Sequence, residues 1–229
     1  MKKDIFADLQ TQIFNKMYKI TTFILLFLIF ATFSYETNAQ NWDIRTLEKI
    51  NSNPNQFLKD YSIFMSETTI GIAFTTPAVL GITALITNDD EMLKNALYVG
   101  ASMFVNTGLT YGLKGAFNRP RPYITYPDLV EPYKHFESRS MPSGHTSLAF
   151  STATSLSLKY PKWYVIAPSY FWACSVGYSR MNLGVHYPSD VIAGAVLGIG
   201  SAYLTLLVNE WFWGKLNNNR ILTLHSYPL

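Results

Sequence analysis

Residues 179–209 read SRMNLGVHYPSDVIAGAVLGIGSAYLTLLVN, and this stretch decides the fold. Its first part holds ionisable residues at fixed spacing, Ser179-Arg180-x5-His186-x3-Asp190. Its second part is an uncharged apolar run, about as long as a helix must be to cross a hydrocarbon core of ~30 Å. A cluster of ionisable side chains therefore leads directly into an apolar helix, which predicts a polar site at one end of a membrane span.

Three other runs resemble the apolar run 191–209. The runs 68–87, 95–113 and 163–179 also carry no charged residue and are each about 17–20 residues long. A further run, 146–158, is rich in serine and threonine, whose small side chains let helices approach closely inside a bundle. The sequence therefore predicts an all-α fold, a membrane-embedded helical bundle.

The composition agrees with contact to lipid. Charged residues make up 14% of the 229 residues, against about 25% in an ordinary soluble domain. A net charge of +3 without a long basic run argues against nucleic-acid binding. The mean hydropathy of +0.08 is low for a membrane protein, but the four charge-free runs outweigh it. The single cysteine, Cys174, cannot form an internal disulfide, and its apolar surroundings predict a buried thiol.

The N-terminal segment, 1–39, has the pattern of a signal peptide. Its apolar run, 20–33, follows two lysines and precedes the small-residue sequence Thr37-Asn38-Ala39, which is typical of a cleavage site. Because the residues before Met17 are more numerous and more polar than an export signal needs, we expect translation to start at Met17. An uncleaved signal anchor is the alternative.

Three parts are expected after this segment. Residues 40–62 form an external polar segment, a short surface helix or loop; 63–215 form the helical domain; and 216–229 form a C-terminal tail. With residue 40 outside, alternating passes bring all the ionisable motifs to the outer ends of the helices. This topology predicts a multi-pass protein of the bacterial inner (cytoplasmic) membrane whose active site faces the periplasm or exterior.

Two further motifs join the first at these outer ends. They read Lys114-x6-Arg121-Pro122 and Pro142-Ser143-Gly144-His145. Lys114, Arg121 and Arg180 supply three cations, and guanidinium groups match phosphate oxygens in bidentate pairs. Ser143 and Gly144 precede an apolar run, so their amides and the start of a helix suit an anion. The set predicts a phosphate-binding site.

The histidines add chemistry to this binding site. An imidazole is a good nucleophile when it is neutral and oriented by a partner on its second nitrogen. Asp190 lies four residues after His186, close enough to orient it, so His186 is the expected nucleophile. His145, at the start of another helix, is the expected general acid and then the base that activates water. Each residue alone has an ordinary structural explanation, but their joint occurrence on one face favours a catalytic site.

The loop 123–141 and Arg119 are not expected to belong to the phosphate-binding group. The loop 123–141, with Tyr123 and Arg139 among its residues, is expected to be a simple interface loop, and a lining of the substrate entrance is the alternative. Arg119 is expected to lie near the pocket but outside the group that binds phosphate.

Together the three motifs resemble the signature of the type 2 phosphatidic acid phosphatase (PAP2) superfamily, over residues 60–213. The resemblance implies an all-α bundle and a metal-independent phosphohistidine mechanism without a cofactor. It implies phosphate ligation by Lys114, Arg121, Ser143, Gly144 and Arg180. It also implies that His145, His186 and Asp190 are catalytic.

The expected function is that of a membrane phosphatase that hydrolyses a lipid phosphate or diphosphate monoester and releases inorganic phosphate. Its partners are then the lipid substrate and the surrounding membrane lipids, with no nucleic acid. Phosphatidic acid, phosphatidylglycerol phosphate, a polyprenyl diphosphate and the phosphate of lipid A are all compatible substrates. The alternative is a soluble, exported class A type acid phosphatase of broad specificity, and a non-enzymatic anion-binding membrane protein is a third candidate.

Overall fold

A computed structural model describes residues 37–224 of the chain, with side chains described for 42–209 and 211. Residues 37–224 form helices joined by loops and contain no strand, which confirms the all-α prediction. The predictions for residues 1–36, including the start at Met17, and for 225–229 lie outside the described residues. The helices are α2 (Thr37–Asn51), α3 (Gln56–Thr87), α4 (Asp90–Phe117), α5 (Pro122–Thr125), α6 (Gly144–Lys159), α7 (Trp163–Asn182) and α8 (Pro188–Leu224).

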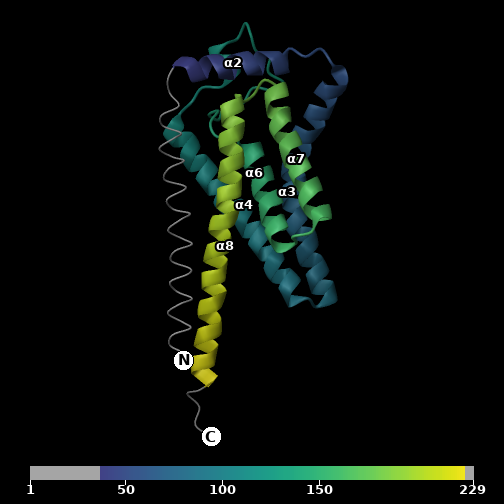
Figure 1. Cartoon of the computed structure of the whole chain (residues 1–229), viewed down its shortest axis with the longest axis vertical. Helices are drawn as coiled ribbons and strands as arrows, with labels where there is room; N and C mark the ends of the chain where they lie inside the picture. Colours follow the sequence, from purple (N-terminus) through teal and green to yellow (C-terminus); the bar gives the residue numbers. More distant parts are fainter. Residues whose placement is uncertain (1–36, 225–229) are drawn as a thin grey trace. The chain divides into compact units, whose positions relative to one another are not determined.

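The chain divides into two compact units, residues 36–203 and residues 1–35 with 204–229. Within the first unit, α3, α4, α6 and α7 pack against one another as a bundle. The short helix α2 lies across one end of this bundle (Figure 1). All contacts described below belong to this first unit.

The bundle has an inverted polarity relative to a water-soluble protein. Large apolar side chains face outward: Ile86 of α3 is 75% exposed, Phe104 of α4 71% and Phe171 of α7 70%. Apolar surface of this extent is a liability in water but is stable against lipid. The fold is therefore the predicted membrane-embedded helical bundle. Small polar side chains fill its interior, including Ser62, Ser66, Thr69, Ser102, Thr110, Ser147, Ser151, Thr152 and Ser155.

Two described helices can cross a membrane by length and composition alone. They are Gln56–Thr87, with a mean hydropathy of 1.8, and Pro188–Asn209, with 2.1. These helices contain the predicted spans 68–87 and 191–209. In the apolar 18-residue stretch of each helix, only 17% and 39% of the stretch is buried, so most of its surface is available to lipid.

Asparagine and aspartate specify where α3 and α4 end and begin. Asn88 ends α3 in the left-handed conformation (φ 53°), which asparagine tolerates better than most residues. Asp89 then caps α4 by accepting a hydrogen bond from the Met92 amide at 2.9 Å. At the far end, Asn118 is also left-handed (φ 47°) and ends α4 one turn after Lys114. The chain therefore leaves α4 just beyond the first cation of the site.

Two glycines let α8 pack directly on α6. A Cβ at Gly194 would lie 2.7 Å from the Ser143 carbonyl oxygen, and one at Gly198 would overlap the Ser147 carbonyl oxygen. Only glycine permits this backbone contact. It draws Asp190, one turn before Gly194, against the start of α6, where the Ser143 amide donates to the Asp190 carbonyl at 3.0 Å.

Three expectations need correction. α3 begins at Gln56, so the expected boundary between 40–62 and 63–215 falls inside one helix. Within 40–62, α2 is a short helix, which is one of the two expected forms, but it buries Asp43, Ile44 and Leu47 and is therefore more than a surface helix. Cys174 is exposed rather than buried, because its position on α7 faces away from the bundle interior.

Candidate active site

The three motifs meet around one cavity of about 370 Å³. Their side chains come from the end of α4, the segment before α5, the start of α6, the end of α7 and the turn before α8. Six of the eight predicted site residues line the cavity, and the other two, Ser143 and Asp190, are fully buried behind its wall. The six are Lys114, Arg121, Gly144, His145, Arg180 and His186.

The turn that carries His186 is fixed by packing. Leu183, Val185 and Tyr187 are buried in one apolar cluster together with Ile44 and Leu47 of α2. Gly184, within the turn, has a positive φ of 68°, and a Cβ there would lie 2.5 Å from the Glu131 carbonyl oxygen. The turn therefore requires glycine at this position. The buried side chains of Val185 and Tyr187 hold the turn on either side of His186.

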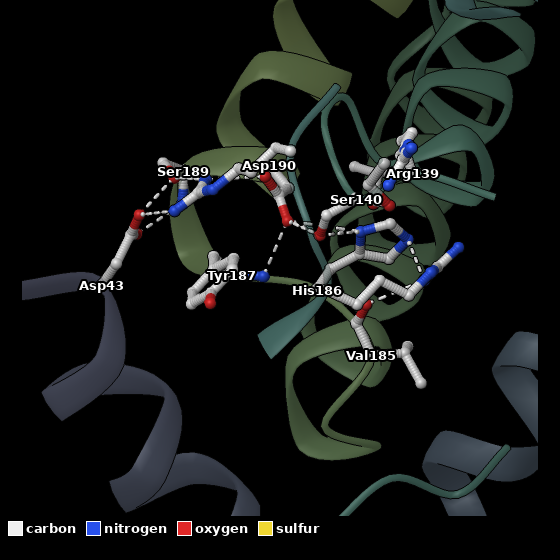
Figure 2. Close-up of polar contacts among 12 residues, drawn as sticks. Asp43, Arg139, Ser140, Val185, His186, Tyr187, Ser189 and Asp190 are labelled. Carbon is white, nitrogen blue, oxygen red and sulfur yellow. Dashed lines mark hydrogen bonds and ion pairs between the residues drawn. The ribbon is translucent and has the colours of Figure 1, made fainter. Parts of the chain in front are cut away.

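His186 and Asp190 form a buried pair, as their spacing predicts. The Nδ1 atom of His186 lies 3.4 Å from Oδ2 of Asp190, and the two side chains are 2% and 0% exposed. Ser140 donates its hydroxyl to the same carboxylate oxygen, and the Tyr187 amide donates to it at 2.9 Å (Figure 2). The carboxylate is therefore held in one orientation.

The other ring nitrogen of His186 faces the cavity. Its Nε2 atom lies 3.3 Å from Nη1 of Arg121. A guanidinium cannot accept a hydrogen bond, so Nε2 must be the acceptor and the ring proton lies on Nδ1, toward Asp190. Burial lowers the pKa of His186 well below its ordinary value, the Asp190 hydrogen bond opposes this, and the charges of Arg121 and Arg180 add to the lowering. The ring is thus neutral at neutral pH, with a lone pair directed at the cations.

Arg121 is fixed by the loop and the turn. Its Nε donates to the Ser138 carbonyl at 2.8 Å, Nη2 to the Ser138 hydroxyl at 2.9 Å, and Nη1 to the Val185 carbonyl at 2.8 Å. The side chain is only 3% exposed. These bonds place its charge beside the lone pair of His186.

Arg180 approaches from α7 and keeps a free donor. Its Nη1 donates to the hydroxyl of Ser66 on α3, whereas its Nε is buried without a partner. The guanidinium groups of Arg121 and Arg180 both lie near the Phe136 ring, at 4.7 and 5.3 Å from its centre. Such cation–π contacts stabilise each cation in the absence of an anion. An unpartnered Nε on a buried cation leaves one donor without an acceptor among the described residues.

The ammonium group of Lys114 is bound by backbone carbonyls of the loop before α6. Its ammonium donates to the carbonyl of Arg139 and, at 3.3 Å, to that of Ser140. The side chain is 8% exposed and lines the cavity beside Gly144. Neutral carbonyls orient the cation without neutralising its charge.

The start of α6 supplies a helix N-terminus to the cavity. Gly144 and His145 line it, and the first amides of a helix have no intrahelical acceptor. Ser143 differs from the expectation: its amide donates to the Asp190 carbonyl and its hydroxyl pairs with the Thr146 hydroxyl at 2.9 Å. In this structure Ser143 therefore braces the start of α6 and does not line the cavity.

As expected, Arg119 lies beside the site without lining the cavity. Its partners were not expected from the sequence: it bonds Oδ1 of Asp190 at 2.8 Å and Oδ2 of Asp43 at 2.8 Å. No local signal indicated Asp43. Phe136 and Ser138 of the loop 123–141 line the cavity, which favours the alternative that this loop lines a substrate entrance.

Among the described residues, no group of three or more His, Cys, Asp or Glu side chains is placed to hold a metal ion. The charge at the cavity comes from Lys114, Arg121 and Arg180.

The model of the PAP2 superfamily matches residues 95–213 of this chain. An undecaprenyl-diphosphatase of Sulfolobus acidocaldarius is 37% identical over 92 residues, which are 40% of this chain and 43% of the relative. A lipid A 1-phosphatase of Rhizobium johnstonii is 36% identical over 126 residues, 49% of this chain and 50% of the relative. These matches span half or less of the length of either relative.

Two solved structures are similar over most of their lengths. The crystal structure of LpxE from Aquifex aeolicus matches with a TM-score of 0.61 and 29% identity, over 72% of this chain and 94% of that one. A transmembrane phosphatidylglycerolphosphate phosphatase from Bacillus subtilis matches with a TM-score of 0.68 over 84% and 96%. The second, at 24% identity, shows the shared fold alone.

Proposed function

Because this chain belongs to the PAP2 superfamily, we propose that it is a membrane phosphatase that hydrolyses a lipid phosphate or diphosphate through a phosphohistidine intermediate. One observation carries the proposal. A neutral imidazole paired with Asp190 presents its lone pair to a cavity whose lining includes three cations and a helix N-terminus. Such a cavity is suited to a phosphoryl group in front of a nucleophile.

In the first step, Nε2 of His186 attacks phosphorus and the bond from phosphorus to the lipid oxygen breaks. Lys114, Arg121 and Arg180 stabilise the negative charge on the non-bridging oxygens. Asp190 stabilises the positive charge that develops on the ring, because its Oδ2 atom lies 3.4 Å from Nδ1. Burial and the charges of Arg180, Arg121 and Lys114 lower the pKa of His145 to about 3 in the free cavity, so His145 takes up a proton when the phosphoryl anion binds. It then donates this proton to the leaving oxygen, which departs as an alcohol or, from a diphosphate, as a lipid monophosphate.

In the second step, water attacks phosphorus and the N–P bond breaks. His145, now deprotonated, accepts a proton from this water, and inorganic phosphate leaves. His186 returns to its neutral form with the proton on Nδ1. Atoms and charges balance over the cycle without an ion or cofactor, because the chain's own cations screen the phosphoryl oxygens.

A lipid substrate is favoured by the apolar wall of the cavity. Ile70 and Phe74 of α3 and Tyr111 of α4 line the cavity and are also 52%, 47% and 68% exposed on the outer surface of the bundle. The cavity therefore extends from the cations to a surface that faces lipid. A hydrocarbon chain can remain in the membrane there while its phosphate reaches His186.

The exposed apolar faces argue against the alternative of a soluble exported phosphatase. The two relatives named above act, by their names, on undecaprenyl diphosphate and on the 1-phosphate of lipid A, both of which carry long hydrocarbon chains. We propose the same general class of substrate here, and a location in the inner membrane with the site facing the periplasm or exterior.

Phosphate release from purified lipids tests this function. The full chain in detergent micelles should release inorganic phosphate from at least one lipid phosphate or diphosphate, and EDTA should leave the rate unchanged within about twofold. A water-soluble phosphate monoester, assayed in parallel, should be a poor substrate. If no lipid releases phosphate, or if EDTA abolishes the release, the proposal is wrong in its substrate or in its metal independence.

The apolar wall should discriminate between lipid and soluble substrates. Phe74→Ser removes apolar contact beside the cavity, so we expect kcat/KM for the lipid to fall about tenfold, the equivalent of about 1.4 kcal/mol of apolar contact. Hydrolysis of the soluble monoester should be unchanged. Phe171→Ser is the matched control, because Phe171 is exposed on α7 and does not line the cavity. Equal losses for both substrates would contradict lipid entry at this wall.

A further inference from the structure

Arg119 holds the turn between His186 and Asp190 although it does not line the cavity. Its Nη1 donates to Oδ1 of Asp190 at 2.8 Å and to the Ser189 hydroxyl at 2.7 Å. Its guanidinium carbon lies 3.9 Å from the centre of the Tyr187 ring. One side chain thus contacts three of the four residues that follow His186.

Asp43 holds Arg119 from the opposite side. It lies on α2, is 3% exposed, and accepts from Nη2 of Arg119 at 2.8 Å. It also accepts from the Ser189 amide at 2.9 Å and from the Ser189 hydroxyl (Figure 2). Ser189 is the second residue of α8, so Asp43 caps this helix from outside. The family match begins at residue 95, and α2 therefore lies outside it.

The two oxygens of Asp190 have separate tasks. Oδ2 faces Nδ1 of His186, whereas Oδ1 is paired with Arg119. A fully buried carboxylate is stable as an anion only if it is paired and hydrogen-bonded. The charge of Arg119 satisfies this need while leaving Oδ2 for the imidazole. Asp43 in turn fixes the plane of the guanidinium, since Arg119 bridges the two carboxylates.

From this geometry we infer that Arg119 and Asp43 are positioning residues, which keep Asp190 ionised and oriented and thereby hold His186 with its lone pair toward the cavity. Neither residue contacts the substrate. α2 is then part of the catalytic apparatus through a relay from Asp43 to Arg119 to Asp190. The kinetic part of this inference rests on the proposed function, whereas its structural part does not.

The kinetic test compares kcat with KM for the lipid substrate. Arg119→Gln should lower kcat about 10- to 100-fold, as loss of an outer hydrogen-bond partner of a functional histidine does, and should change KM by less than about twofold. Arg119→Lys should recover part of kcat, because it restores the charge but cannot bridge two carboxylates. The isosteric variant Asp43→Asn should lower kcat about three- to tenfold, and less when Arg119→Gln is already present.

Arg45→Gln is the matched control. It removes a charge from the exposed face of α2 and should leave kcat and KM unchanged. Melting temperature and elution volume in detergent should show that each variant is folded. If Arg119→Gln does not fold, Asp43→Asn carries the test, because it keeps the shape of the side chain.

A second readout does not depend on activity. The sequence has four histidines, so ¹⁵N-histidine spectra of the full chain can be assigned by replacing each in turn. Wild-type His186 should show the neutral tautomer with the proton on Nδ1 at neutral pH. This signal should shift or broaden in Arg119→Gln and Asp43→Asn, and should stay in place in Arg45→Gln.

The outcomes separate the two proposals. A His186 signal that responds to Arg119→Gln, in a protein that releases no phosphate from any lipid, would support the relay and refute the phosphatase. An unchanged His186 signal and unchanged kcat in both variants would refute the relay and leave the phosphatase standing. A rise in KM with kcat unchanged would also overturn the positioning role, because it would indicate that these residues bind the substrate.

Discussion

Replacing His186 by alanine should abolish phosphate release, lowering kcat about 10⁴-fold or more. The reason is that Nε2 of His186 is the atom expected to form the bond to phosphorus, and removing a nucleophile eliminates the covalent pathway. The three cations and the start of α6 stay in place, so inorganic phosphate should still compete for the cavity. The measurement is release of phosphate from the lipid preferred in the substrate screen.

His135→Ala is the control for His186→Ala. His135 packs against the Tyr123 ring, 5.0 Å between ring centres, and does not line the cavity. It should retain wild-type activity within about twofold. Both variants should insert into the membrane and elute from a sizing column as the wild type does. If His186→Ala keeps more than about a tenth of the wild-type kcat, another group is the nucleophile.

Replacing Arg180 by lysine should lower kcat/KM about 10²- to 10³-fold. Its buried Nε has no partner among the described residues, which leaves this donor for a phosphoryl oxygen. Lysine keeps the charge but loses the planar pair of donors that matches phosphate, and the loss of one such donor in a dry site costs about this much. The expected effect lies mainly in kcat, because charge on the phosphoryl oxygens is redistributed in the transition state.

Ser66→Ala separates the charge of Arg180 from its orientation. Ser66 on α3 accepts a hydrogen bond from Nη1 of Arg180 and does not line the cavity. Its loss should lower kcat/KM by about tenfold or less, because the guanidinium remains. If Ser66→Ala were as damaging as Arg180→Lys, the main task of Arg180 would be to hold α3 and α7 together.

The helical fold could be predicted because each element carries its own local signal. The apolar runs 68–87 and 191–209 lie inside the helices α3 and α8. Asn88 and Asp89 mark the turn between α3 and α4. The extents were less predictable. α3 begins at Gln56, before the predicted run 68–87, since Asn55 caps it there by accepting from the Leu58 amide at 3.2 Å.

The site could be predicted wherever partners are close in sequence. His186 and Asp190 are four residues apart, and their contact follows from one turn of chain. Arg119 and Asp43 are separated by 76 residues, and Asp43 lies in a polar stretch without any distinguishing pattern. Their contact depends on how α2 crosses the end of the bundle, which is a property of tertiary packing. The contact of Asp43 with Arg119 could therefore not be predicted from the sequence, whereas the contact of His186 with Asp190 could.

Trapping the covalent intermediate tests the central claim most directly. The full chain would be mixed with lipid substrate carrying labelled phosphate, quenched in alkali within one turnover, and digested for peptide mapping. The account predicts label on residue 186, stable to alkali and labile to acid as an N–P bond is, and none in His186→Ala. A burst of lipid product with no labelled protein, or label on any other residue, would contradict it.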